Sequence, residues 1–258
     1  MMYNHKVNIV VNDQLISYQR TGAGQVVLML HGWGASLRSF KPLADELSRS
    51  YQVISLDFPG FGNSPVPHSS WSVSDYVDLV KHFLVKLRVK DCYAVIGHSF
   101  GGRVIIKGIG TGQLTPQRVI LIDAAGIKPK DTIKGSVLAS SAKAGKVILS
   151  TPGFNRFKDK LTQQFRLKFG SSDYQDANEM SEIFKKVVRE DLTSYLPSIK
   201  QPTLLLWGED DNETPLSDAK LMHSKIADSK LVSYPNAGHY VYLDELKQVT
   251  EKISGFLK

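Results

Sequence analysis

The chain has 258 residues, of which 42% are hydrophobic and 22% charged, and its formal net charge is +7. This composition is typical of a globular protein with enough core to fold without disulfides, and the single cysteine, Cys92, excludes an internal disulfide and a cysteine-rich zinc site. No apolar run is long enough to span a membrane and no apolar leader follows Met1, so we expect a cytoplasmic protein.

Short apolar runs and amphipathic stretches alternate along most of the chain. Residues 7–11 and 15–19 predict a β-hairpin that turns at Asn12-Asp13. Further apolar runs predict strands at 26–30, 53–56, 93–96, 119–122, 203–207 and 231–234. Helical spacing predicts helices at 37–48, 72–87, 101–109, 215–226 and 243–257. This order is typical of a mostly parallel sheet with helices on both faces.

The alternation stops between residues 127 and 196. This stretch has no strong strand and favours several amphipathic helices. Because it lies between two predicted core strands, we interpret it as a helical cap inserted into a core made of residues 1–126 and 197–258.

The same stretch carries most of the excess positive charge. Residues 127–195 hold 13 Lys and Arg against 8 Asp and Glu. Their signs alternate without a basic block, which favours a solvated face over a nucleic-acid interface. We expect no nucleic-acid partner, although the excess also permits attraction of an anionic ligand.

The segment Gly97-His98-Ser99-Phe100-Gly101 follows a predicted strand and precedes a predicted helix. A G-x-S-x-G pattern in this position places the serine on a tight, strained turn at the carboxyl edge of the sheet. The helix N-terminus also stabilises negative charge that forms beside it. Ser99 is therefore our candidate nucleophile.

Serine needs a neighbouring base, and His239 is the best candidate of the seven histidines. It follows the last predicted strand, at the sheet edge where catalytic groups gather. Asp211, after the strand 203–207, is our candidate for the acid that orients it; Asp123 and Asp210 are the alternatives. The order Ser99, Asp211, His239 is that of the α/β-hydrolase triad.

The segment His31-Gly32-Trp33-Gly34 follows the strand 26–30. Small residues there allow backbone N–H groups to turn towards a developing oxyanion. We assign this role to the N–H groups of Trp33 and Phe100, since one donor in this architecture comes from the residue after the nucleophile. We expect His31 to support the loop through hydrogen bonds.

Together these segments resemble the α/β-hydrolase superfamily. The resemblance extends to Asp57-Phe58-Pro59-Gly60-Phe61-Gly62-Asn63-Ser64, Trp207-Gly208-Glu209-Asp210-Asp211 and Gly238-His239. It implies an eight-stranded, mostly parallel sheet with a cap after the sixth strand, and no cofactor or metal. The serine separates this chain from similar branches that use an aspartate nucleophile. Arg103 resembles an arginine of a related menaquinone-pathway synthase; a structural ion pair is the alternative.

The local pattern looks most like capped carboxylesterases and the hydrolases of ring-cleavage diketones. We expect a serine hydrolase that acts on a small carboxylic ester, with a substrate that is apolar or carries an anionic group. Hydrolysis of a carbon–carbon bond and slow ligand binding on the same scaffold are the alternatives. Candidate residues lining the substrate site are Trp33, His98, Phe100, Phe154 and Tyr240.

Overall fold

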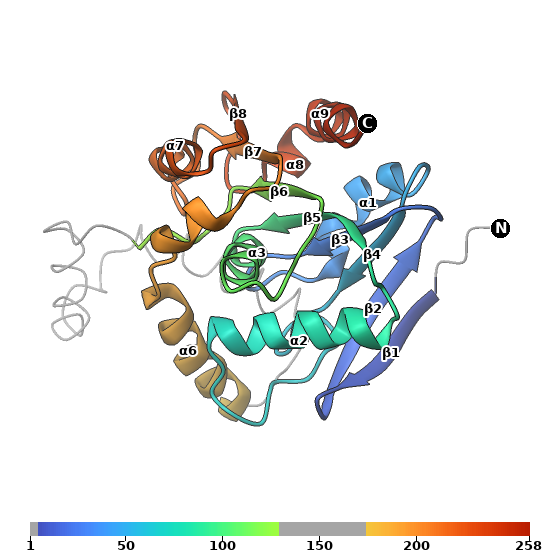
Figure 1. The fold of residues 1–258 in the computed structure, drawn as a ribbon. Helices are drawn as coiled ribbons and strands as arrows, with labels where there is room; N and C mark the ends of the chain where they lie inside the picture. The colour runs from blue at the N-terminus through green and yellow to red at the C-terminus, as the bar shows by residue number, and fades with distance from the viewer. Residues whose placement is uncertain (1–4, 129–173) are drawn as a thin grey trace, which may run out of the picture.

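The computed structural model describes residues 5–128 and 174–258 and contains one eight-stranded sheet (Figure 1). The strands are β1 (His5–Val11), β2 (Gln14–Thr21), β3 (Val26–Leu30), β4 (Gln52–Leu56), β5 (Cys92–His98), β6 (Arg118–Ile122), β7 (Thr203–Gly208) and β8 (Ser229–Tyr234). Their order is β1-β2-β4-β3-β5-β6-β7-β8, and β2 is antiparallel to both neighbours while β3 to β8 are parallel. The predicted mostly parallel sheet is confirmed.

Helices cover both faces of this sheet (Figure 1). They are η1 (Leu37–Phe40), α1 (Lys41–Leu47), α2 (Val73–Lys86), α3 (Phe100–Gly110), α6 (Tyr174–Arg189), η2 (Thr193–Ser198), α7 (Leu216–Lys225), α8 (Val241–Asp244) and α9 (Leu246–Leu257). Along β3, Leu28 and Leu30 belong to the core beneath α2 and α3, and Val27 and Met29 to the core beneath α1 and α9. This burial on both faces explains the continuous apolar runs.

Two helices that the sequence predicts as continuous are interrupted. The stretch 37–48 divides into η1 and α1. Pro42 has no backbone N–H to continue a helix from the residues before it, but it fits the first turn of α1, where an N–H has no partner within the helix. The stretch 243–257 is divided at Glu245, between the end of the short α8 and the start of α9 at Leu246. Asp244 closes α8 and accepts a hydrogen bond from Gly238 N–H (2.9 Å), which ties this corner to the loop before it.

The strand order reverses beside β3, and this places the candidate site. From β3 the chain crosses to β4 on one side and later to β5 on the other. The loops that follow β3 and β5 therefore separate at their carboxyl ends, which is where ligands bind in open α/β sheets. Ser99 follows β5 and Trp33 follows β3.

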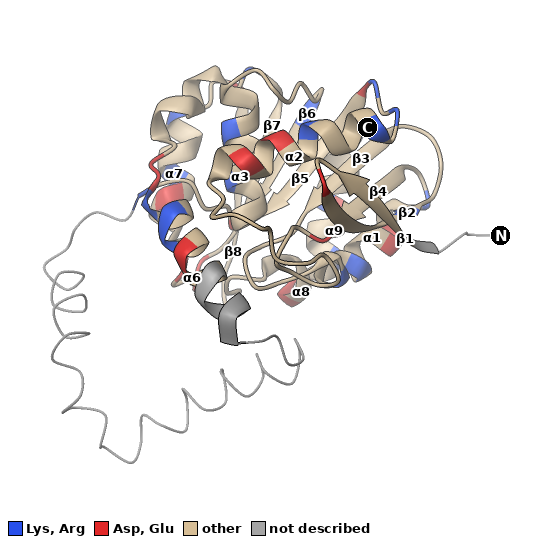
Figure 2. Ribbon diagram, turned by 90° about the horizontal axis from the view of Figure 1, so that it is seen from below, with Lys and Arg blue, Asp and Glu red and all other residues tan. Residues whose placement is uncertain are grey.

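Charged residues of both signs are interspersed along the described helices (Figure 2). On α6, Lys185 pairs with Glu182 (2.5 Å) one turn away, and Lys186 donates to the Ser70 carbonyl oxygen (3.0 Å). No described helix has the length and hydrophobicity needed to cross a membrane.

Candidate active site

Ser99 lies on the tight turn between β5 and α3. Its backbone has φ 49° and ψ −111°, a conformation in which a residue with a side chain is strained. Its N–H donates to the Ile122 carbonyl oxygen (3.1 Å), and its own carbonyl oxygen accepts from Ala125 N–H (2.9 Å). Bonds to β6 and the segment after it thus hold the strained turn in place.

The glycines on either side of this turn leave no space for side chains. A Cβ at Gly97 would lie 2.6 Å from the nitrogen of Gly102, and a Cβ at Gly101 would overlap the carbonyl oxygen of Leu30. Larger residues would push α3 away from β3 and β5. The glycines of the sequence pattern therefore allow the helix to pack directly against the sheet.

His239 lies between β8 and α8 and is bonded to Asp211. His239 Nδ1 is 2.8 Å from Asp211 Oδ2, and the Asp211 side chain is fully buried. The other oxygen, Oδ1, accepts from the N–H groups of Glu213 (2.7 Å) and Thr214 (3.0 Å). Because the carboxylate is held by its own loop, it fixes both the position of the imidazole and the tautomer with hydrogen on Nδ1.

Each member of this pair changes the titration of the other. Burial alone would raise the pKa of Asp211, but the hydrogen bonds from His239 and Thr214 outweigh it and lower the pKa. Burial alone would lower the pKa of His239, but the bond and charge of Asp211, followed by the charge of Glu213, outweigh it and raise the pKa. The site therefore favours an imidazolium opposite a carboxylate.

Thr214 is a contact residue that the sequence analysis did not identify. Its hydroxyl donates to Asp211 Oδ2 (2.7 Å) and lies 3.0 Å from the Asp123 carbonyl oxygen and 3.4 Å from His239 Nδ1. The spacing Asp211-x-x-Thr214 could have indicated this contact in the sequence, because an aspartate side chain often accepts hydrogen bonds from the backbone N–H groups two and three residues later.

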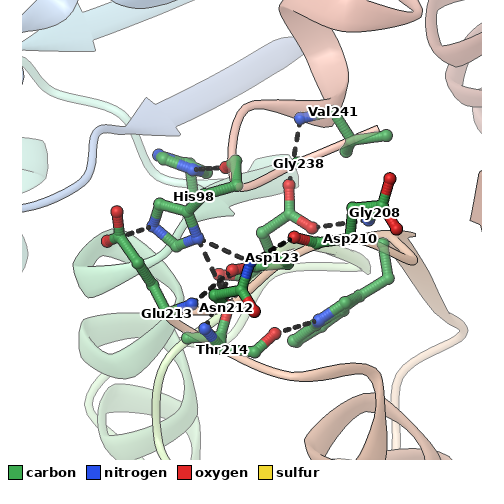
Figure 3. Close-up of polar contacts among 12 residues, drawn as sticks. His98, Asp123, Gly208, Asp210, Asn212, Glu213, Thr214, Gly238 and Val241 are labelled. Atoms are coloured by element: carbon green, nitrogen blue, oxygen red, sulfur yellow. Dashed lines mark hydrogen bonds and ion pairs between the residues drawn. The ribbon is translucent and has the colours of Figure 1, made fainter. Parts of the chain in front are cut away.

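The alternative acids lie elsewhere. Asp123 is buried at the end of β6, where it accepts from the N–H groups of Gly208 (2.8 Å) and Val241 (3.2 Å) and is not bonded to the imidazole (Figure 3). Burial raises the pKa of Asp123 to about 8, against the effect of these two donors. Asp210 is exposed. Asp123 instead joins the loops that carry Asp211 and His239.

The second imidazole nitrogen faces a residue that the sequence did not single out. His239 Nε2 lies 3.3 Å from Glu213 Oε2 (Figure 3), and the Glu213 side chain is 71% exposed. Ser99 Oγ makes no hydrogen bond to His239 in this structure. Such bonds are often long in unliganded enzymes and shorten when substrate binds.

His98 lies behind His239 and not in an open pocket. Its side chain is buried, with Nε2 2.7 Å from the His239 carbonyl oxygen, and burial lowers the pKa of His98 to about 3. The neutral ring therefore donates from Nε2 and holds the loop that carries the candidate base. A Cβ at Gly32 would lie 2.7 Å from His98 Nδ1, so the loop after β3 also packs against this ring.

The candidate oxyanion donors lie on the two loops at the strand-order reversal. The first intrahelical bond of α3 runs from Arg103 N–H to the Ser99 carbonyl oxygen, so the Phe100 N–H is one of the free donors of a helix N-terminus. Trp33 N–H donates to no other described residue. His31 stabilises this loop: its Nδ1 bonds to the Gly32 carbonyl oxygen (2.7 Å) and its Nε2 accepts from Phe58 N–H (2.9 Å).

Aromatic side chains surround this loop. The Trp33 ring packs edge-on against Phe61 and Phe100, with ring centroids 4.8 and 5.3 Å away, and contacts Phe184 of α6 at 5.1 Å. Phe100 is buried in the core, whereas Tyr240 is 37% exposed beside the His239 ring. Of the candidate lining residues, Trp33 and Tyr240 thus retain exposed surface; Phe154 lies outside the described residues.

Arg103 makes a structural contact with the segment after α6. It is buried and donates to the Glu190 carbonyl oxygen, while Lys107 pairs with the Glu190 carboxylate. The side chain is thus held at the junction of α3 with residue 190.

Two other features do not contribute to the site. Within residues 5–128 and 174–258, no group of three or more His, Cys, Asp or Glu side chains is arranged to hold a metal ion. A groove of about 700 Å³ lies between β8 and α9, lined in part by Lys230, Gln248 and Phe256, but by none of Ser99, Asp211 and His239. The three candidate residues therefore lie outside this groove.

The comparisons with known proteins agree with this architecture. A model of the alpha/beta hydrolase family matches residues 27–252. The chain therefore belongs to the alpha/beta hydrolase family.

Two relatives in sequence illustrate the reactions found in this family. The chain is 27% identical to a pimeloyl-[acyl-carrier protein] methyl ester esterase of Shewanella woodyi, over 92% of this chain and 95% of that one. It is 23% identical to a 2-hydroxy-6-oxo-6-(2'-aminophenyl)hexa-2,4-dienoic acid hydrolase of Metapseudomonas resinovorans, over 93% and 86%. The structure of an esterase from Exiguobacterium antarcticum superposes with a TM-score of 0.78 at 23% identity, covering 98% and 99% of the two chains.

Proposed function

We propose that this hydrolase cleaves small carboxylic esters through an acyl-enzyme on Ser99. The observation that carries the proposal is the 2.8 Å bond between buried Asp211 and His239. These two residues lie on the loops after β7 and β8, at the edge of the sheet where Ser99 occupies its strained turn after β5. A buried carboxylate that orients a histidine base is the arrangement that activates a serine hydroxyl for attack on a carbonyl carbon.

The reaction has two halves. Ser99 Oγ attacks the ester carbonyl carbon while His239 Nε2 takes the hydroxyl proton, and the tetrahedral intermediate expels the alcohol, to which His239 returns the proton. Water then attacks the acyl-enzyme, again giving a proton to His239, and the acid leaves as Ser99 regains its hydrogen. Asp211 stays ionised throughout and stabilises the imidazolium, which the lowered pKa of Asp211 favours.

The N–H groups of Trp33 and Phe100 are our proposed oxyanion donors. A preorganised donor of this kind contributes about 3 kcal/mol to transition-state stabilisation. Edge-on contacts to Phe61 and Phe100 fix the Trp33 ring. Its backbone N–H is therefore already in place before the reaction and needs no reorganisation energy. The loop thus supplies both an electrostatic site and an apolar surface.

Residues 127–196 are proposed to form a helical cap over this edge. Leu192 N–H donates to the Gly126 carbonyl oxygen (2.8 Å), so the residue before the segment is joined to a residue near the segment's C-terminal end. The described part includes the helix α6, whose Phe184 reaches Trp33. This contact supports a cap that contributes apolar surface to the substrate site.

Carbon–carbon bond hydrolysis is the second candidate, favoured by the relative from Metapseudomonas resinovorans. The two reactions are separated by assaying p-nitrophenyl butyrate and a ring-fission diketone with the same enzyme. We expect kcat/KM to be at least about 100-fold higher for the ester, a difference of roughly 3 kcal/mol in transition-state binding. A higher value for the diketone would assign the site to carbon–carbon cleavage instead.

A further inference from the structure

We propose that Glu213 determines charge selectivity for the leaving-group half of the substrate, so that esters of neutral or cationic alcohols are preferred over esters of anionic alcohols. This inference rests on the proposed ester hydrolysis and adds to it the class of alcohol released. It assigns a specificity role to a residue that lies outside the Ser99, Asp211 and His239 set.

The position of the Glu213 carboxylate is the first observation. Its Oε2 lies 3.3 Å from His239 Nε2, the atom that returns a proton to the departing alcohol. The leaving oxygen must therefore approach within a few ångströms of Glu213. The Glu213 side chain is 71% exposed, so its charge is open to a group that approaches His239 Nε2 from solvent.

The surrounding charges are the second observation. Apart from His239 itself, Glu213 makes no ion pair with any described residue. The charged groups that act on His239 are Asp211, Glu213 and Asp123, all of them acidic. Glu213 also raises the pKa of Tyr240, after the larger effect of burial on that hydroxyl. The charges that act most strongly on His239 are thus negative, and no described Lys or Arg forms an ion pair with Glu213.

The chemistry of the contact restricts what Glu213 does. A neutral His239 with its hydrogen on Nδ1 presents a lone pair at Nε2, which a carboxylate does not hydrogen-bond. The Glu213 contact is favourable only with the imidazolium, the form present when the alcohol is expelled. A cationic group on the alcohol shares this attraction, and an anionic group is repelled.

The test compares three butyrate esters that differ in the charge of the alcohol. They are the esters of choline, of the neutral isostere 3,3-dimethylbutanol and of the anionic alcohol isethionate. Each kcat/KM is divided by that of the neutral ester, which cancels any effect of the variant on His239 itself. We expect the wild-type enzyme to prefer the choline ester and to disfavour the isethionate ester.

Glu213→Gln is expected to reduce the choline preference and the isethionate discrimination by about three-fold or more each, the scale of a solvent-screened charge at this distance. Glu213→Lys is expected to reverse the order. Glu209→Gln is the matched control: it removes the same charge from the same loop, but Glu209 bonds to Ser233 and not to His239.

The outcomes separate the two proposals. If wild-type enzyme hydrolyses none of the three esters, the ester function fails and this inference fails with it. If it hydrolyses them and Glu213→Gln leaves both ratios at the wild-type values, ester hydrolysis stands and the role of Glu213 is overturned. Equal changes in the Glu209→Gln control would also overturn it, because they would show a general effect of net charge.

Discussion

Ser99→Ala is expected to reduce kcat for p-nitrophenyl butyrate by about 10⁶-fold, the loss typical when the nucleophile of such a triad is removed. The variant keeps the turn, since alanine retains the Cβ and the backbone bonds to Ile122 and Ala125 do not involve the hydroxyl. KM should change little, because the groups that bind the ester remain. Steady-state kinetics with the single ester give both values.

Ser233→Ala is the matched control for this variant. Ser233 lies on β8, and its hydroxyl bonds to Glu209, away from the candidate site. Its kcat should stay within about two-fold of wild type, as is usual for a surface change of this size. Activity of Ser99→Ala within ten-fold of wild type would contradict the assignment of the nucleophile.

Asp211→Asn is expected to reduce kcat by about 10⁴-fold. The asparagine oxygen continues to accept from the loop N–H groups of Glu213 and Thr214, which places its NH₂ group towards His239 Nδ1. The imidazole then carries its hydrogen on Nε2 and cannot take the Ser99 proton. Because Asp211 also raises the pKa of His239, the acid limb of the remaining activity should move to lower pH.

The wild-type pH profile provides the reference for that shift. Activity requires neutral His239, so kcat/KM should fall as pH drops through a pKa above the ordinary 6.5. Asp210→Asn is the control, since Asp210 is exposed and adjacent to Asp211. An Asp210→Asn loss as large as that of Asp211→Asn would refute the assignment of the acid.

The sheet and its connections were predictable because they depend on local patterns. The run 26–30 is apolar at every position and is buried on both faces of β3, and the helix predicted from residue 72 begins with a capping box of Ser72 and Asp75. The interruptions of the two helices were harder to predict from the sequence. Apolar residues recur with a helical period throughout 37–48, although the preference of Pro42 for the first turn of a helix indicates a new helix start there. The end of α8 depends on a tertiary contact, the hydrogen bond from Gly238 N–H to Asp244.

Part of the site depends on tertiary structure that no local pattern encodes. G-x-S-x-G indicated the turn at Ser99, but the choice between Asp211 and Asp123 required knowing which loop reaches His239. Asp123 bonds two backbone N–H groups from separate loops, a contact that exists only after β6, β7 and α8 have assembled. Glu213 has no sequence signature, since its importance lies in the 3.3 Å approach to the imidazole.

The proposed acyl-enzyme is tested most directly by the mass of the peptide containing Ser99 during ester turnover. Wild-type enzyme mixed with excess p-nitrophenyl butyrate and quenched in acid should show a butyryl group on Ser99, together with a burst of p-nitrophenol. Asp211→Asn should form the same adduct more slowly, and Ser99→Ala should form none. Turnover of the ester without an adduct on Ser99, or with the butyryl group on another residue, would contradict the proposed acyl-enzyme.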